Sequence, residues 1–217
     1  MKVAAAWQSP PATLELSADE LHLWKIDLST AELPGILNQQ EQQRVDRLIV
    51  AEKKQQFSQA RNALRHILSR YLNEHPAELV FEYGAEGKPY LKVGRVHFNL
   101  SHSNNWAVLA VTSAGPVGVD LEHTGKSISR QALVERFFNP EEKRSFAAAS
   151  VARRNRQFFR LWTRKESLLK LSGLGWQGVK TQPVEDIVSR HFLVAKNYLS
   201  CASFPSSITS IIKLKYL

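Results

Sequence analysis

One segment, residues 158–170, constrains the fold more than any other because it puts charges on the packing face of a predicted helix. At helical spacing, one stripe carries five of its side chains: Phe158, Trp162, Lys165, Glu166 and Leu169. An amphipathic helix normally keeps its charges on the opposite, solvated face. A charge on the packing face is costly unless it is paired or bound to a metal. The stripe therefore predicts a long helix that holds a carboxylate and an ammonium against another part of the protein.

A second pair of carboxylates lies upstream, in residues 116–122. The alternation of side chains predicts a strand with Asp120 and Glu122 on the same face. Acids two residues apart on a strand lie about 6–7 Å apart and repel each other if they are unpaired. Mg²⁺ prefers carboxylate oxygens, takes one or two of them in typical sites, and accepts substrate phosphates. Asp120, Glu122 and Glu166 are thus candidate Mg²⁺ ligands.

Cationic and hydroxyl side chains follow other predicted elements. Lys88 lies in a turn after a strand-like run, and Ser101 and His102 end an apolar strand. Arg61 and Arg65 are one turn apart on a predicted helix. Cations and hydroxyls beside a Mg²⁺ site suit a phosphorylated ligand.

Each of these residues also has a simpler interpretation. Taken alone, Asp120 and Glu122 are more often solvated strand acids, and Glu166 could pair with Lys170 one turn later on the helix. Lys88 could only mark a turn before a proline. Ser101 and His102 could be a satisfied strand end or a nucleophile pair, but no Gly-x-Ser-x-Gly elbow surrounds Ser101.

Other aromatic and basic residues are more ambiguous. Trp162 is expected to pack in the core and seat its helix. Arg65 and Arg70 compete with Arg61 for a ligand-binding role, and Arg44 and Arg47 are possible further cations.

Four motifs occur together in a characteristic order. They are Gly87–Pro89, Phe98–Ser103, Gly118–Glu122 and Trp162–Ser167, with Arg136-Phe137-Phe138 and Glu141-Glu142 between the last two. In this order and spacing the chain resembles the 4'-phosphopantetheinyl transferases, in particular their longer, surfactin-synthetase-activating type. The resemblance runs from about Arg61 to Gly175, which is most of the chain.

This resemblance implies transfer of 4'-phosphopantetheine from coenzyme A to a serine of an apo carrier protein, with release of 3',5'-ADP. It implies Mg²⁺ held by Asp120, Glu122 and Glu166, with Lys165 stabilising phosphoryl oxygens and Glu166, or a water that it orients, accepting the serine proton. The catalytic set is then Asp120, Lys165 and Glu166. The implied coenzyme A contacts are Arg61, Lys88, Ser101, His102, Lys165 and Lys170.

The order of predicted elements, together with the resemblance, favours an α+β fold. We expect two similar lobes related by a pseudo-twofold, each with a small antiparallel sheet packed on a long helix and with coenzyme A between them. The expected N-terminal lobe is 1–100 and the C-terminal lobe 101–217, although no internal sequence repeat is evident. Strand 106–112 is expected to form a hairpin with the Asp120 strand, and the tail from Ile208 shows no clear pattern.

Composition indicates which kind of partner the protein binds and in which compartment it is expected. The net charge of +9 predicts an acidic partner, here an acidic carrier protein bound by a monomeric enzyme. A basic nucleic-acid-binding module and another Mg²⁺-dependent nucleotide enzyme are the alternatives, but no zinc-finger or RNP motif appears. A single cysteine, no long apolar run and no signal-like N-terminus predict a cytoplasmic protein without a membrane segment.

Overall fold

The computed structural model describes residues 1–29, 35–92, 95–176 and 186–216. These residues form five α-helices, the two longest of which have 22 residues each. The helices are α1 (Gln39–Arg47), α2 (Ala51–Leu72), α3 (Arg130–Phe137), α4 (Pro140–Ala147) and α5 (Val151–Ser172), and a 3₁₀ turn spans Pro76–Glu78. The predicted long helix around Glu166 is confirmed as α5.

The strands of the described residues form three sheets. The largest has the order β1 (Lys2–Val3), β10 (Ser210–Tyr216), β2 (Glu20–Asp27), β6 (Trp106–Thr112), β5 (His97–Ser103). The second has the order β7 (Gly118–His123), β9 (Tyr198–Pro205), β8 (Ile187–Ala195), and β3 (Phe81–Tyr83) and β4 (Pro89–Leu91) form a small hairpin. The second sheet is antiparallel, as expected. The first is mixed, because β1, β10 and β2 run parallel.

The two halves repeat one topology that is not evident in the sequence. In each half a strand is followed by shorter helical structure, a 22-residue helix and an antiparallel hairpin. In each sheet the first strand then pairs with the second strand of that hairpin, as β2 does with β6 and β7 with β9. This order agrees with the expected two-lobed α+β fold.

The sheets do not divide at residue 100. That position lies inside β5, and both β6 and β10 belong to the sheet of the N-terminal half. The tail that carried no clear sequence pattern is β10, inserted between β1 and β2. The expected hairpin of β6 with β7 is wrong: both edges of β6 are occupied, by β2 and β5, so β7 joins the second sheet.

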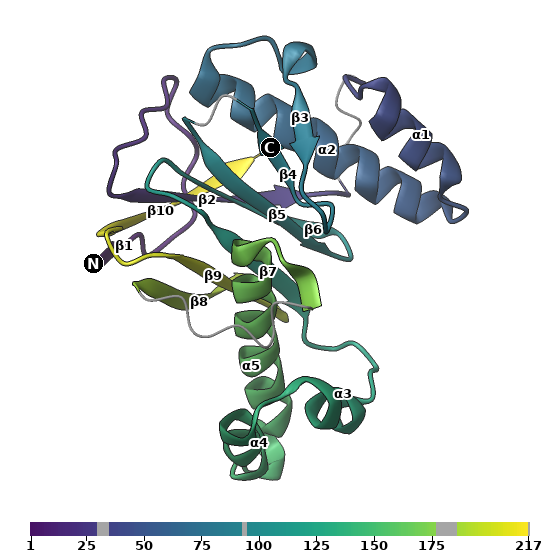
Figure 1. The fold of residues 1–217 in the computed structure, drawn as a ribbon, viewed down its shortest axis with the longest axis vertical. Coiled ribbons are helices and arrows are strands. Elements are labelled where there is room, and N and C mark those ends of the chain that lie inside the picture. The colour runs from purple at the N-terminus through teal and green to yellow at the C-terminus, as the bar shows by residue number, and fades with distance from the viewer. Residues whose placement is uncertain (30–34, 93–94, 177–185, 217) are drawn as a thin grey trace.

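The layers stack as α2, the five-stranded sheet, the three-stranded sheet and α5 (Figure 1). Alternation along the strands explains this order. Trp24 and Ile26 of β2 face α2, whereas Leu21 and Leu23 face the second sheet. A third, aromatic cluster joins α3 and α4 to the projecting half of α5.

Candidate active site

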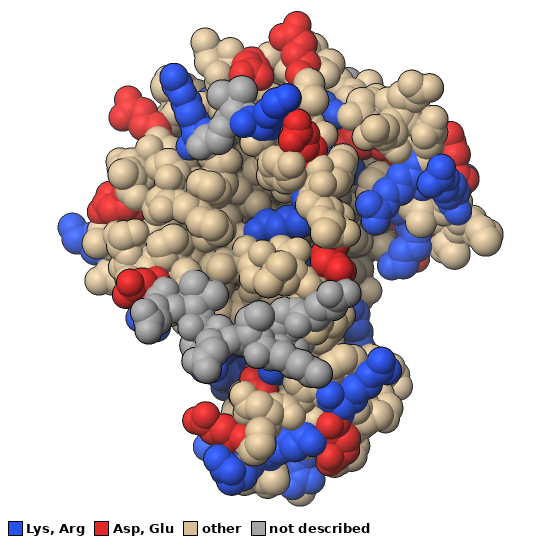
Figure 2. Space-filling model, viewed as in Figure 1, with Lys and Arg blue, Asp and Glu red and all other residues tan. Residues whose placement is uncertain are grey.

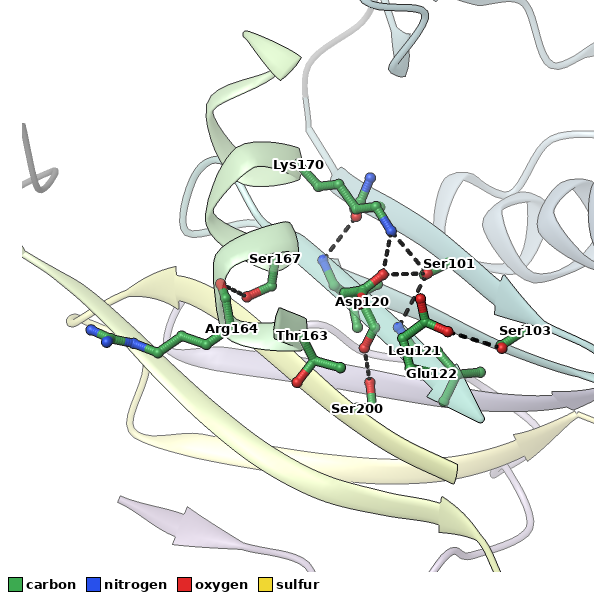
Figure 3. Close-up of polar contacts among 12 residues, drawn as sticks. Ser101, Ser103, Asp120, Leu121, Glu122, Thr163, Arg164, Ser167, Lys170 and Ser200 are labelled. Atoms are coloured by element: carbon green, nitrogen blue, oxygen red, sulfur yellow. Dashed lines mark hydrogen bonds and ion pairs between the residues drawn. The ribbon is translucent and has the colours of Figure 1, made fainter. Parts of the chain in front are cut away.

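Asp120 is held against α5 by a very close approach of strand and helix. A Cβ atom on Gly118 would lie 2.0 Å from the Ser167 carbonyl oxygen, so only glycine allows this packing. Two residues along β7, Asp120 is 4% exposed. Its Oδ1 accepts hydrogen bonds from Lys170 Nζ at 2.6 Å and from Ser101 Oγ at 3.1 Å (Figure 3). Its Oδ2 is buried and has no partner among the described residues.

Glu166 lies one helical turn before Lys170, within the field of both strand acids. Its pKa is raised to about 7, first by burial and then by the negative charge of Asp120, with a smaller contribution from Glu122; the Lys170 ammonium opposes the shift. In the described residues no hydrogen bond to the Glu166 carboxylate is present. Glu166 is thus close enough to Asp120 and Glu122 for their charges to raise its pKa.

Glu122 forms an ion pair with Lys126, which follows the end of β7. Its Oε2 lies 2.5 Å from Lys126 Nζ and accepts a weaker hydrogen bond from Ser103 Oγ. In the part of the chain that the structure describes, no three acidic, histidine or cysteine side chains converge closely enough to hold a metal ion. Lysines accompany two of the three predicted ligands, Asp120 and Glu122.

A row of β5 side chains aligns the strand of acids. Asn99, Ser101 and Ser103 accept hydrogen bonds from the backbone N–H groups of Val119, Leu121 and His123, at 2.8, 3.2 and 3.1 Å. Two edge strands of different sheets are thus joined through side chains. Sequence reasoning missed Asn99 and Ser103, although polar residues at i, i+2 and i+4 of a strand share one face and are a usable signal.

Lys165 does not point to the acids in this structure. Its Nζ lies 2.9 Å from Oε2 of Glu142, and both side chains are largely buried. The same Glu142 carboxylate accepts the Asn139 N–H and closes the capping box that starts α4. Glu142 was noticed in the sequence only as part of a motif, because its ion pair joins separate helices.

Arg61 is also committed to an internal contact. Its guanidinium pairs with Glu41, whose carboxylate is shared with the fully buried Arg65, and it donates to Tyr83 Oη at 3.1 Å. Arg61 nevertheless lines a cavity of about 580 Å³. Its basic lining also includes Arg44 and Arg47.

Lys88 and His102 complete the predicted set. Lys88 Nζ donates to the carbonyls of Val117 and Leu171, and Lys88 borders a cavity of about 240 Å³ together with Glu166 and Lys170. His102 is exposed on β5. Loss of solvation lowers its pKa, and Lys53, Lys170, Lys126 and Arg44 lower it further.

Aromatic side chains pack around Trp162, and one of them, Trp176, lines the same cavity as Glu166. Trp162 is half-buried and stacks on Phe158, with Phe137 and Trp176 at its edges. Phe138 is buried and Phe137 half-buried, so neither member of the Phe-Phe pair is fully exposed.

Both halves of the chain match models of known protein families. Residues 116–208 match the 4'-phosphopantetheinyl transferase superfamily, and residues 26–114 match the 4'-phosphopantetheinyl transferase N-terminal family. The 4'-phosphopantetheinyl transferase HetI of Nostoc sp. is 36% identical over 178 residues, covering 78% of this chain and 75% of the relative. This chain belongs to the 4'-phosphopantetheinyl transferase family.

Further relatives agree with that assignment. AcpT of Salmonella typhi is 34% identical over 67% of this chain and 77% of its own length. Sfp of Bacillus subtilis is 34% identical over 52% of this chain and 49% of its own. The chain is therefore a transferase that moves 4'-phosphopantetheine from coenzyme A to a carrier protein. The described part of the chain has no helix long and apolar enough to cross a membrane.

Proposed function

We propose that this transferase holds Mg²⁺ with Asp120, Glu122 and Glu166 and binds coenzyme A across the two lobes. The observation that carries the proposal is Asp120 Oδ2, which lies on β7, the strand that packs against the helix of Glu166, and is buried without a partner among the described residues. An oxygen-only donor set of this kind suits Mg²⁺. The raised pKa of Glu166 is a second sign that charge at this site is incompletely balanced.

Lys170 pairs with Asp120 and Lys126 pairs with Glu122, so a bound Mg²⁺ would have to displace these ammonium groups or share the carboxylates with them. Lys170 and Lys126 have flexible stems and stay partly exposed, so both ammonium groups could turn toward an incoming phosphate. Mg²⁺, when bound, would offset the carboxylate repulsion and neutralise charge on the diphosphate. Lys170 would then lie between Asp120 and the diphosphate.

Glu166 is the group we assign to the serine proton. A carboxylate at the reacting centre can accept a proton directly or through a water that it orients. It lines the cavity of about 240 Å³ together with Lys170, so the carrier serine could reach it from that opening. The serine oxygen attacks the β-phosphorus, the proton passes to Glu166 or to a water it orients, and 3',5'-ADP leaves.

The nucleotide end of coenzyme A fits the basic cavity of about 580 Å³. Arg44, Arg47 and Arg61 line it, and guanidinium groups suit phosphate oxygens. Ser101 and His102 lie on β5 next to Asp120 and Lys170, and they complete the proposed contacts toward the diphosphate. Lys165 would join them after leaving Glu142.

An acidic carrier protein is the proposed partner, bound by a monomer. Figure 2 shows Lys and Arg side chains gathered at α1 and at the end formed by α3, α4 and the start of α5. All five arginines of α5 are exposed, and none forms an ion pair among the described residues: Arg153, Arg154, Arg156, Arg160 and Arg164. Such unpaired charge favours association with an acidic surface.

Intact-mass spectrometry of an apo carrier protein tests the proposal. With this chain, coenzyme A and Mg²⁺, the carrier should gain the mass of one phosphopantetheine arm. A carrier whose acceptor serine is replaced by alanine is the control. Removal of Mg²⁺ by a chelator should stop the gain, and added Mg²⁺ should restore it. An unchanged rate in chelator would rule out the metal site.

A further inference from the structure

Lys88 connects the small β3–β4 hairpin to the two elements that carry the acids. Its Nζ donates to the Val117 carbonyl at 3.0 Å and to the Leu171 carbonyl at 3.2 Å. Val117 precedes the first residue of β7, and Leu171 lies in the last turn of α5. One ammonium thus touches the strand of Asp120 and the helix of Glu166 at the same time.

The chemistry of these acceptors suits an ammonium. The last four carbonyls of a helix have no partner within the helix, and the negative end of the helix dipole favours a cation there. No carboxylate forms an ion pair with Lys88 among the described residues. Burial lowers its pKa to about 8, so most molecules keep the ammonium charged at neutral pH.

The contact lies where strand and helix are closest. Gly118, which follows Val117, is the residue whose missing side chain lets β7 approach α5 at Ser167 and Leu171. Lys88 holds the end of this contact. Two site residues are near this contact in the sequence: Asp120 follows Gly118 by two residues on β7, and Lys170 directly precedes Leu171 on α5.

The hairpin that supplies Lys88 also borders both proposed ligand cavities. Tyr83, Gly87 and Pro89 line the basic cavity of about 580 Å³, and Gly87, Lys88 and Pro89 line the cavity beside Glu166. A ligand that occupies both cavities would pass along this hairpin. The position of the hairpin therefore matters to both ends of the ligand.

We propose that Lys88 is a positioning residue that fixes the β7–α5 contact, and with it the geometry of the acids, rather than a phosphate ligand. The proposal rests on the proposed function of the acid site. It replaces the coenzyme A contact that the sequence pattern suggested for Lys88. A phosphate ligand would have its ammonium free for the substrate, whereas two of the three donors of Lys88 are already used by the protein.

Substitution by methionine removes the donors and keeps the length of the stem. For Lys88→Met we expect kcat to fall at least tenfold, with the KM for coenzyme A changing less than threefold. Lys92→Met is the matched control, because Lys92 follows the same hairpin, is 79% exposed and should have no effect on either constant. Arg44→Met, in the basic cavity, should instead raise the KM for coenzyme A with little change in kcat.

Two results would overturn the proposal. A rise of tenfold or more in the coenzyme A KM of Lys88→Met, at unchanged kcat, would make Lys88 a ligand contact. Unchanged kcat and KM with a lower melting temperature would make its role purely structural. Wild-type turnover in the same assay separates either result from a failure of the proposed function itself.

A chemical rescue keeps the test decisive if Lys88→Met folds poorly. Lys88→Cys can be alkylated to restore an aminoethyl ammonium of nearly the same length, since the only other cysteine, Cys201, is buried. The unmodified cysteine variant should show the low kcat, and aminoethylation should raise it severalfold. No recovery on alkylation, with the modification confirmed by mass, would contradict the proposal.

Discussion

The two halves of the molecule link a first strand to a long helix in the same way but with different chemistry. In the N-terminal half, His22 and Trp24 of β2 bind the Tyr71 hydroxyl near the end of α2, at 2.7 and 2.8 Å. In the C-terminal half, Asp120 of β7 binds Lys170 near the end of α5. The first link is neutral and aromatic, and the second is charged.

The remaining charges follow the same division. In the N-terminal half, Glu41 is 1% exposed and receives both Arg61 and Arg65, so its carboxylate is fully used. Arg65 Nη2 is the one buried side-chain atom of this group that lacks a partner in the described residues. In the C-terminal half, Asp120 Oδ2 and the Glu166 carboxylate have no hydrogen-bond partners among the described residues. The comparison shows that the same topology carries a fully paired buried carboxylate in one half and incompletely paired carboxylates in the other, where we propose that the metal binds.

The largest expected effect comes from the charged link. We expect Asp120→Asn and Glu166→Ala each to lower transfer at least 100-fold, about 2.7 kcal/mol of transition-state stabilisation, while the fold stays intact. Single-turnover assays with an apo carrier measure the rate, and circular dichroism checks folding. Tyr71→Phe is the control from the other half, and it should lower stability and leave kcat unchanged. Folded acid variants that keep more than a tenth of the wild-type rate would refute the site.

The buried ion pair of the N-terminal half should affect stability instead. Glu41→Gln leaves two guanidinium groups without a buried counter-charge, which typically costs about 3–5 kcal/mol. For a chain of this size we expect a fall in melting temperature on the order of 10 °C. Glu135→Gln, which breaks an exposed ion pair with Lys143, should change it by less than about 3 °C. Equal shifts for both variants would contradict the comparison.

The sequence predicted the acids better than their surroundings. Strand alternation and the helix stripe each placed one acid, Asp120 or Glu166, on a particular face of its own element, because both signals are local. The partners of Lys88 are backbone carbonyls, one 29 and one 83 residues away, which no side-chain pattern encodes. Glu41 had a local signal in the Asn38–Glu41 capping box, but its two arginines lie on another helix.

The same distinction explains the fold. Strand 106–112 and the long helix around Glu166 follow from hydrophobic periodicity, and the structure has them as β6 (Trp106–Thr112) and α5 (Val151–Ser172). The entry of β10 into the first sheet was not predicted, because it pairs with β1 and β2 at the other end of the chain. Long-range pairing depends on which strand edges are open, and residue spacing does not reveal that.

Glu166 should destabilise the ligand-free protein above neutral pH. Its folded pKa of about 7 exceeds the ordinary 4.5, so the unfolded chain loses this proton first and stability falls as the pH rises between those values. Above pH 7, Glu166→Gln should therefore raise the melting temperature. Allowing for partial exposure, the gain is about 1 kcal/mol, or about 2–4 °C.

Calorimetry between pH 4 and pH 8 checks this. The difference between Glu166→Gln and wild type should vanish near pH 4. A variant less stable than wild type at pH 8 would show that the Glu166 carboxylate is already compensated.

Salt should have the smallest effect, and on one substrate only. The KM for an acidic carrier should rise a few-fold between low and moderate ionic strength, because long-range attraction to exposed arginines is screened. The KM for coenzyme A should change less, since its charged groups would be bound in cavities. Arg153→Gln combined with Arg156→Gln should reduce the salt dependence. If the KM for the carrier did not change with salt, the basic surface would not be the site at which the carrier docks.

Ligand-induced stabilisation tests most directly whether the C-terminal carboxylates bind substrate and metal together. Coenzyme A should raise the melting temperature of the wild type, and Mg²⁺ should increase that rise, because a ligand that binds only the folded state stabilises it by mass action. In Asp120→Asn the additional effect of Mg²⁺ should disappear, whereas in Tyr71→Phe it should persist. A wild-type melting temperature that millimolar coenzyme A leaves unchanged, with or without Mg²⁺, would contradict the account.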